Sequence, residues 1–130
     1  MIIAEQFVPF IRSIIKVVKV AMLAIVFLSL TMPAQATSPS SIELTYDQKA
    51  RTLHIVVKHV TAHMRKHYIR KIEISKNAEK PVAHYYSSQT SASEQIVDIS
   101  LKAKPHDTIH VEAVCSSAGR GAQDLIVPEE

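Results

Sequence analysis

Alternation of apolar and polar residues dominates the chain beyond residue 41 and predicts short β-strands. Apolar residues recur at every second position in five segments: 42–46, 53–57, 72–74, 97–101 and 109–115. Two further short runs, 82–86 and 125–127, are rich in β-prone residues. Turn-forming residues separate these segments, and no apolar stripe with helical spacing extends beyond two turns. The pattern predicts an all-β domain, a seven-stranded immunoglobulin-like antiparallel β-sandwich.

A different pattern occupies residues 1–36, of which 25 are apolar. Three basic residues precede an uncharged run over 20–30, which as a helix would span about 16 Å, roughly half of a bilayer core of about 30 Å. Small residues then end this segment at Ala36. This order predicts a helical secretory signal peptide that is cleaved after Ala36. An uncleaved anchor and a buried core helix are the alternatives. Residues 37–41 are expected to be a polar linker, and 42–130 the domain.

The net positive charge of the chain is distributed unevenly on the two sides of Ala36. The leader carries three basic residues and one acidic residue, a net charge of +2, whereas the remainder carries 12 basic and 11 acidic residues, a net charge of +1. Neither part shows the basic stripe with interleaved aromatic residues that a nucleic-acid partner requires, so that class is excluded. The export signal is the only feature that predicts membrane contact, and it predicts a periplasmic or secreted domain. The sequence predicts no particular oligomeric state.

The chain contains one cysteine, Cys115. Small exported domains are usually stabilised by paired cysteines, so a lone thiol is either buried and inert, paired to another chain or bound to a metal. Cys115 continues the inward face of the segment 109–113, and His59 continues that of 53–57. His63 and His67 follow on the next loop. Imidazole and thiolate ligands that converge at strand ends would suit zinc, iron or copper.

These residues also allow an interpretation without a metal. Histidine is common in loops of exported proteins, and a buried cysteine is usually a small apolar residue. The serine residues lie in serine-rich loops without the pattern that surrounds a catalytic nucleophile, so no nucleophile and base are predicted.

Three segments resemble the iron-binding domain of desulfoferrodoxin and superoxide reductase: 59–74 (HVTAHMRKHYIRKIEI), the turn 104–107 and the strand end 113–115. In that family a His-Pro-Met loop leads into His-Tyr-Ile, a Lys-Pro-Gly-Asp turn follows, and the last strand ends in Tyr-Cys-Asn-Leu-His-Gly. The resemblance covers about residues 42–120 and implies an immunoglobulin-like sandwich. Its members hold iron through four histidines and one cysteine, and the open sixth position accepts superoxide.

The resemblance implies only part of that ligand set. His67 and Cys115 match family ligands, and His59 matches the loop histidine if two extra residues are allowed, with His63 as its substitute. Ala118 stands where the family has its last histidine, and residues 37–53 contain none. Two imidazoles and one thiolate are closer to a zinc or copper arrangement than to a square-pyramidal iron site.

Two functions follow for the exported domain. The first is a superoxide-reductase-like protein that binds iron, or zinc or copper in its place, and transfers one electron from a protein donor to superoxide. The second is a non-catalytic β-sandwich that acts as a binding or structural module, with a degenerate site, no cofactor and Cys115 buried. The missing ligands favour the second function, whereas the persistence of a cysteine without a partner thiol favours a metal.

Overall fold

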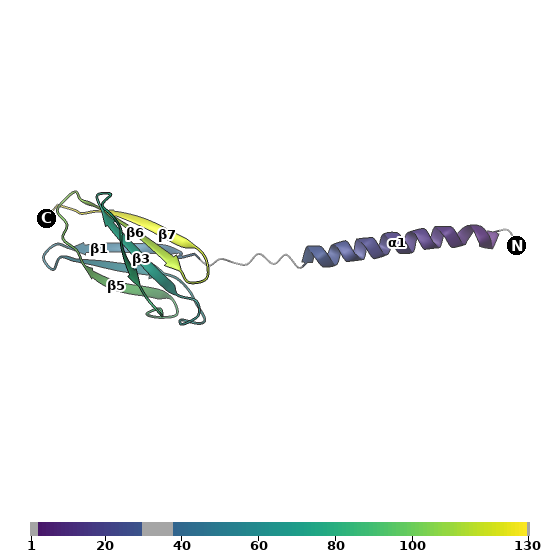
Figure 1. Ribbon diagram of the computed structural model, residues 1–130, viewed down its shortest axis with the longest axis horizontal. Helices are drawn as coiled ribbons and strands as arrows, with labels where there is room; N and C mark the ends of the chain where they lie inside the picture. The colour runs from purple at the N-terminus through teal and green to yellow at the C-terminus, as the bar shows by residue number, and fades with distance from the viewer. Residues whose placement is uncertain (1–2, 30–37, 130) are drawn as a thin grey trace. The chain divides into compact units, whose positions relative to one another are not determined.

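The structure is a computed structural model that describes residues 3–29 and 38–129, and it contains two separate units (Figure 1). One unit is the helix α1 (Ile3–Ser29), with Pro9 in its first turns. Among the residues described, no helix is both long enough and apolar enough to cross a membrane. The predicted cleavage position after Ala36 lies outside the described residues.

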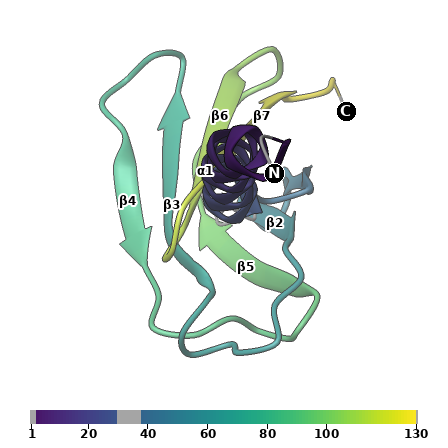
Figure 2. The ribbon, with the colours of Figure 1, turned by 90° about the vertical axis from the view of Figure 1, so that its right-hand side faces the viewer.

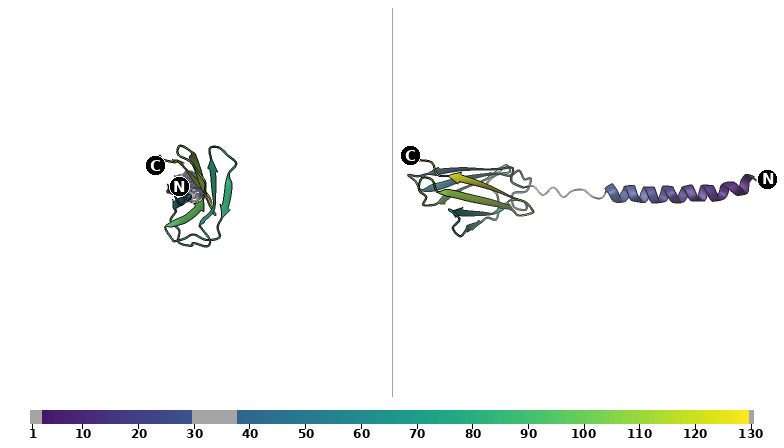
Figure 3. Two further views of the ribbon diagram at one scale, coloured as in Figure 1. Left: turned by 90° about the vertical axis from the view of Figure 1, so that its left-hand side faces the viewer. Right: turned by 90° about the horizontal axis from the view of Figure 1, so that it is seen from above.

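The second unit, within residues 38–129, consists of two antiparallel sheets. Its strands are β1 (Ser41–Asp47), β2 (Thr52–Lys58), β3 (Ile69–Lys76), β4 (Val82–Tyr85), β5 (Glu94–Ser100), β6 (Thr108–Cys115) and β7 (Arg120–Ile126). One sheet has the order β1-β2-β5 and the other β4-β3-β6-β7. The strands run along the length of this unit (Figures 1 and 3). The prediction of an all-β domain with antiparallel sheets is confirmed.

The core lies between the two sheets and is built from the alternating residues that the sequence pattern marks. Leu53, Ile55 and Val57 of β2 are fully buried, and so are the alternating Ile109 and Val111 of β6. The remaining core side chains come from β1, β3, the end of β6 and the residue after β7: Ile42, Tyr46, Ile69, Ile72, Ile74, Ala113 and Val127. Each large aliphatic side chain buried in this way contributes about 1.5–3 kcal/mol to folding. Period-2 alternation therefore determines which face of each sheet is inside.

Strand β3 departs from strict alternation at its first residues. Ile69 pairs with Cys115, but the next pair is Lys71 with Val114, so Arg70 is an extra residue on β3. Such a bulge reverses the inward and outward positions that precede it. Ile69 and Ile72 can therefore both face the core although three positions separate them.

Strand β7 begins five residues earlier than the short run 125–127 that was predicted from the sequence. It pairs with β6 from Arg120 to Ile126, and its residues are mostly exposed at the edge of the four-stranded sheet. Residues 120–124 include no large aliphatic side chain, so the apolar alternation that marks the other strands is missing from this part of β7. Gly121 lies inside β7, and of the two glycines Gly119 has a positive φ, of 90°.

The two ends of the β-sheet unit are closed by different loops. At one end, the loop after β2 and the loop between β4 and β5 run side by side (Figure 2). Backbone bonds join them: Thr61 donates to the carbonyl of Ala92 at 2.8 Å, and Gln89 donates to that of Met64 at 3.1 Å. At the other end, the Tyr46 hydroxyl donates to the Leu101 carbonyl at 2.7 Å. The candidate ligands lie at the first of these ends.

Candidate metal centre

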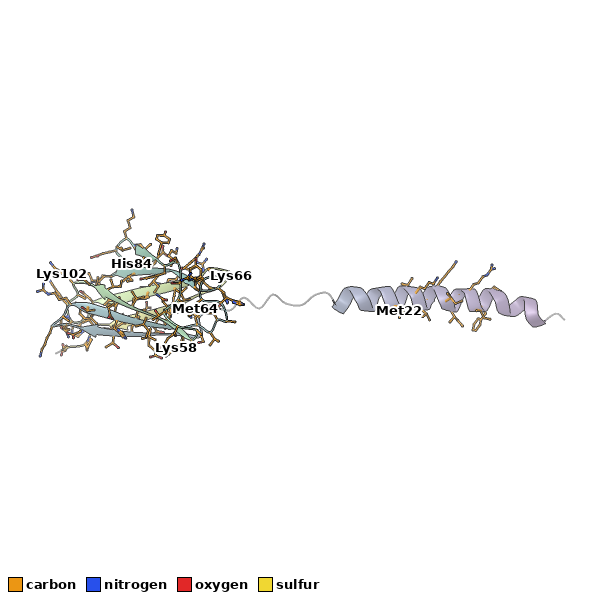
Figure 4. All side chains as sticks on the ribbon, turned by 90° about the horizontal axis from the view of Figure 1, so that it is seen from below. Met22, Lys58, Met64, Lys66, His84 and Lys102 are labelled. Carbon is orange, nitrogen blue, oxygen red and sulfur yellow. The ribbon has the colours of Figure 1, made fainter. Side chains whose placement is uncertain are left out.

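Three of the predicted ligands come together at the end of the unit where the paired loops lie. His59 directly follows β2, His67 lies two residues before β3, and Cys115 is the last residue of β6. One ligand atom from each of these three side chains lies within 4.8 Å of the other two. Figure 4 shows Met64, in the loop between the two histidines, at the opposite end of this unit from Lys102.

Cys115 is held by the sheet and by the turn that follows it. It pairs with Ile69 across β3 and β6, and its side chain is only 2% exposed. Its backbone N–H donates to the Gly119 carbonyl at 3.0 Å, which closes the turn after β6. A Cβ atom at Gly119 would lie 2.4 Å from the Ser38 hydroxyl oxygen, and the positive φ also disfavours other residues. The turn therefore requires glycine next to the thiol.

His59 is the most deeply buried of the candidate ligands, at 1% exposure. It extends the inward face of β2 past the last pair of the β1–β2 ladder, as the alternation predicts. Its backbone N–H donates to the Ser93 carbonyl at 2.9 Å, and its ring Nδ1 lies 2.7 Å from the side-chain oxygen of Gln89. A buried imidazole held at both its backbone and its ring has little rotational freedom.

His67 reaches the same place from a tight turn. The N–H of His67 and the N–H of Lys66 both donate to the carbonyl of His63, at 2.8 and 2.9 Å. The His67 ring is half-buried and lies edge to face with His59, with ring centroids 4.7 Å apart. Burial lowers the pKa of the His67 imidazole below its ordinary value of 6.5, and the neighbouring His59 lowers it further. Both effects favour the neutral imidazole, which is the form that binds metals.

The donor set suits a transition-metal ion. Metal–ligand bonds of about 2.0–2.3 Å keep two donor atoms within about 4.6 Å of each other, so a small closing of the three side chains would be enough to complete a site. Two imidazoles and a thiol are donors typical of zinc, copper and iron, whereas magnesium and calcium prefer oxygen ligands. His59, His67 and Cys115 could therefore hold one metal ion, and one or more coordination positions would remain for a small molecule.

The other histidines lie outside this group. His63 is exposed in the turn before His67, and its backbone N–H is bonded to the Thr61 hydroxyl at 3.1 Å. His54 and His110 point outward, as their position in the alternation predicts, and each lies 2.5 Å from an aspartate of the neighbouring strand. His106 is also exposed and lies 2.8 Å from Glu129.

Sequence reasoning missed one residue of this region, Gln89. Its side chain is only 5% exposed, and it contacts both the ring and the backbone of His59. Gln89 lies in a polar loop without periodicity, thirty positions from His59. No local pattern could have identified it, because only the pairing of the two loops brings the residues together.

Two of the histidine ligands of the resembling family have no matching histidine in this chain. Ala118, at the position of the family's last histidine, is exposed in the turn after Cys115. Strand β1, early in the domain, presents Ile42 and Tyr46 to the core and contains no histidine. Comparisons with protein-family models, with curated proteins and with solved structures found no match to this chain.

Proposed function

We propose that this chain is an exported metalloprotein whose β-sheet domain binds one transition-metal ion through His59, His67 and Cys115. The observation that carries the proposal is the convergence of these three donors within 4.8 Å at one end of the domain. Two of them are nearly inaccessible to water, at 1% and 2% exposure.

The proposal includes a relation to the superoxide-reductase family and its immunoglobulin-like sandwich. Supporting features are the His-Tyr-Ile sequence from His67, the strand β6 that ends at Cys115, and the sheet orders β1-β2-β5 and β4-β3-β6-β7. Export is proposed from the leader, in which basic residues precede an apolar run and small residues follow it.

The chemistry we assign to the site is the one-electron reduction of superoxide. When bound there, ferrous iron would supply one electron to superoxide, which takes up two protons and leaves as hydrogen peroxide, and a one-electron donor protein would restore the ferrous state. The chain itself contributes a thiolate and two neutral imidazoles. His67 is only half-buried, whereas the other two ligands are buried, so we expect a small oxidant to reach the site beside the His67 ring.

Metal analysis of the purified full chain tests the binding function. The chain should retain about one equivalent of iron, zinc or copper after removal of loosely bound metal, and the Cys115→Ala variant should retain none. If the wild-type chain holds no stoichiometric metal after incubation with any of the three, the proposal is wrong.

A separate assay tests the redox function. The iron-loaded chain, supplied with a reductant, should consume superoxide and yield an equal amount of hydrogen peroxide without releasing dioxygen. Release of dioxygen would indicate dismutation instead. A chain that binds metal stoichiometrically but consumes superoxide no faster than the Cys115→Ala variant would be a non-catalytic metal-binding module, the second function predicted from the sequence.

A further inference from the structure

Both the oxygen and the nitrogen of the Gln89 side-chain amide form hydrogen bonds within the loops beside the candidate metal centre. Its Nε2 lies 2.6 Å from the carbonyl oxygen of His59 and 2.9 Å from that of Ser91. Its Oε1 lies 2.7 Å from the ring Nδ1 of His59. The amide therefore makes three hydrogen bonds, and two of them are to the same residue.

These contacts determine which end of the amide faces the imidazole. A carbonyl oxygen only accepts hydrogen bonds, so the two backbone carbonyls of His59 and Ser91 require the NH₂ group of Gln89. If the amide were turned over, its oxygen would face both carbonyl oxygens, and two donors would be lost in a buried place. The oxygen of Gln89 must therefore face the ring.

The orientation of the amide in turn determines the tautomer of His59. Because the Gln89 oxygen can only accept, Nδ1 of His59 must carry the proton and donate it. In a neutral imidazole the other nitrogen, Nε2, then has the lone pair. The lone pair of His59 is therefore on the nitrogen that points away from Gln89.

We infer that Gln89 is a positioning residue of the metal centre, which fixes His59 in the Nδ1–H tautomer so that Nε2 is its ligand atom. This inference rests on the proposed metal-binding function and deepens it. Histidine ligands usually donate their second ring N–H to a carboxylate, a carbonyl or water, and this contact sets the tautomer and the orientation of the ring. Here a neutral amide has that role, so this contact adds no negative charge to the site.

Gln89 also ties together the segments that carry both histidines. Its backbone N–H donates to the carbonyl of Met64, in the turn that presents His67. Its side chain binds the backbone of His59 as well as the ring. Gln89 thus links the loop that carries His67 to the tautomer of His59. The test must therefore distinguish a change of the His59 tautomer from a loss of loop stability.

The tautomer can be read directly by long-range ¹H–¹⁵N NMR of the imidazole in the metal-free full chain. We expect the wild type to show protonated Nδ1 and unprotonated Nε2 at His59. Gln89→Met, which has a similar length but no acceptor, should shift His59 toward the other tautomer. Gln89→Glu loses the two donors to the carbonyls of His59 and Ser91 but keeps an acceptor oxygen for the ring, so in the molecules that remain folded Nδ1 should be protonated.

Gln95→Met is the matched control. Gln95, in β5, is also 5% exposed, and its Oε1 accepts a hydrogen bond at 2.8 Å from the N–H of Thr90, in the loop that carries Gln89. In zinc titrations Gln89→Met should weaken binding about 10–100-fold, the usual loss for an outer-shell partner, whereas Gln95→Met should leave the affinity unchanged.

Several results would overturn the inference: protonated Nε2 at His59 in the wild type, an unchanged tautomer in Gln89→Met, or equal losses of zinc affinity in the two methionine variants. The NMR result does not depend on metal. If the wild type shows the expected tautomer and Gln89→Met loses it, but no metal binds, the role of Gln89 in holding His59 stands and the proposed metal-binding function fails.

Discussion

The rings of His59 and His67 lie edge to face, with centroids 4.7 Å apart and an interplanar angle of 81°. Protonation of both rings would place two positive charges in contact within a largely buried region, which is unfavourable. The lowered pKa of His67 agrees with this, with burial as its main cause and His59 as the second. These effects favour the neutral form of His67, which is the form that binds a metal ion.

The position of His67 relative to His63 leads to the first prediction. His67→Ala should weaken zinc binding by more than the about 10–100-fold that loss of an outer-shell partner costs, because it removes a direct ligand. His63→Ala should leave the affinity unchanged, since His63 is exposed and lies outside the donor group. Zinc titration monitored by calorimetry measures both. The reverse order of effects would make His63 the ligand.

Replacement of the thiol should separate metal binding from packing. Cys115→Ala removes a buried group of about the size of a methylene, so the metal-free chain should lose only about 1 kcal/mol of stability. Metal binding, however, should be abolished. The control is Ile109→Val on the same strand, which should cost about 0.5–1.5 kcal/mol and leave metal binding intact. Urea unfolding with and without zinc measures both quantities. Zinc stabilisation that persists in Cys115→Ala would contradict the ligand assignment.

Asp107 gives the domain a dependence on acid pH at the end remote from the metal centre. The Asn77 side-chain amide and the Lys104 backbone N–H both donate to its carboxylate at 2.8 Å, and they lower its pKa below the ordinary 3.8. A carboxylate with a lowered folded-state pKa stabilises the fold above the unfolded-state value, and this stability is lost as the pH falls through the folded-state value.

The urea midpoint of the wild type should therefore decrease as the pH is lowered from above 3.8 to below it. Asp107→Asn should show a smaller decrease over the same range, because its side chain does not titrate. Parallel pH profiles for the two proteins would mean that the Asp107 contacts do not stabilise the folded state.

Tyr46 is expected to stabilise the loop between β5 and β6. Its hydroxyl donates to the Leu101 carbonyl at 2.7 Å and accepts from the Ala103 N–H at 3.0 Å. Tyr46→Phe leaves both backbone groups without this partner, and should cost about 1–3 kcal/mol in thermal or urea unfolding. Tyr85→Phe is the control, since Tyr85 is 76% exposed, and should change stability by no more than about 0.5 kcal/mol. Equal losses of stability in Tyr46→Phe and Tyr85→Phe would show that the Tyr46 hydroxyl does not stabilise this loop.

The fold was predictable to the extent that burial leaves a periodic trace in the sequence. The alternation at Leu53, Ile55 and Val57 correctly assigned the inward face of β2 and the burial of His59 beyond it. Strand β7 was placed too late because its first five residues, 120–124, include no large apolar side chain and leave no such trace. The bulge at Arg70 was not predicted, since it depends on how β3 pairs with β6.

The site was predictable only in part for the same reason. Parity placed His59 and Cys115 inside, but whether the loop residues His63 and His67 reach them depends on a tight turn whose geometry is not encoded in alternation. The role of Gln89 could not be predicted from the sequence, because it depends on a contact between two loops. Residues in regular strands can be assigned from local pattern, whereas loop residues can be assigned only once tertiary pairing is known.

X-ray absorption spectroscopy of the zinc-loaded full chain tests the central claim most directly, because it counts the atoms bound to the metal. We predict one sulfur at about 2.3 Å and two imidazole nitrogens at about 2.0–2.1 Å, with any further ligand a light atom. In His67→Ala, loaded at a high zinc concentration, the sulfur should remain and one imidazole should disappear, whereas Cys115→Ala should retain no zinc to measure. A spectrum with no sulfur, or with no imidazole nitrogen, would contradict the assignment of this metal centre.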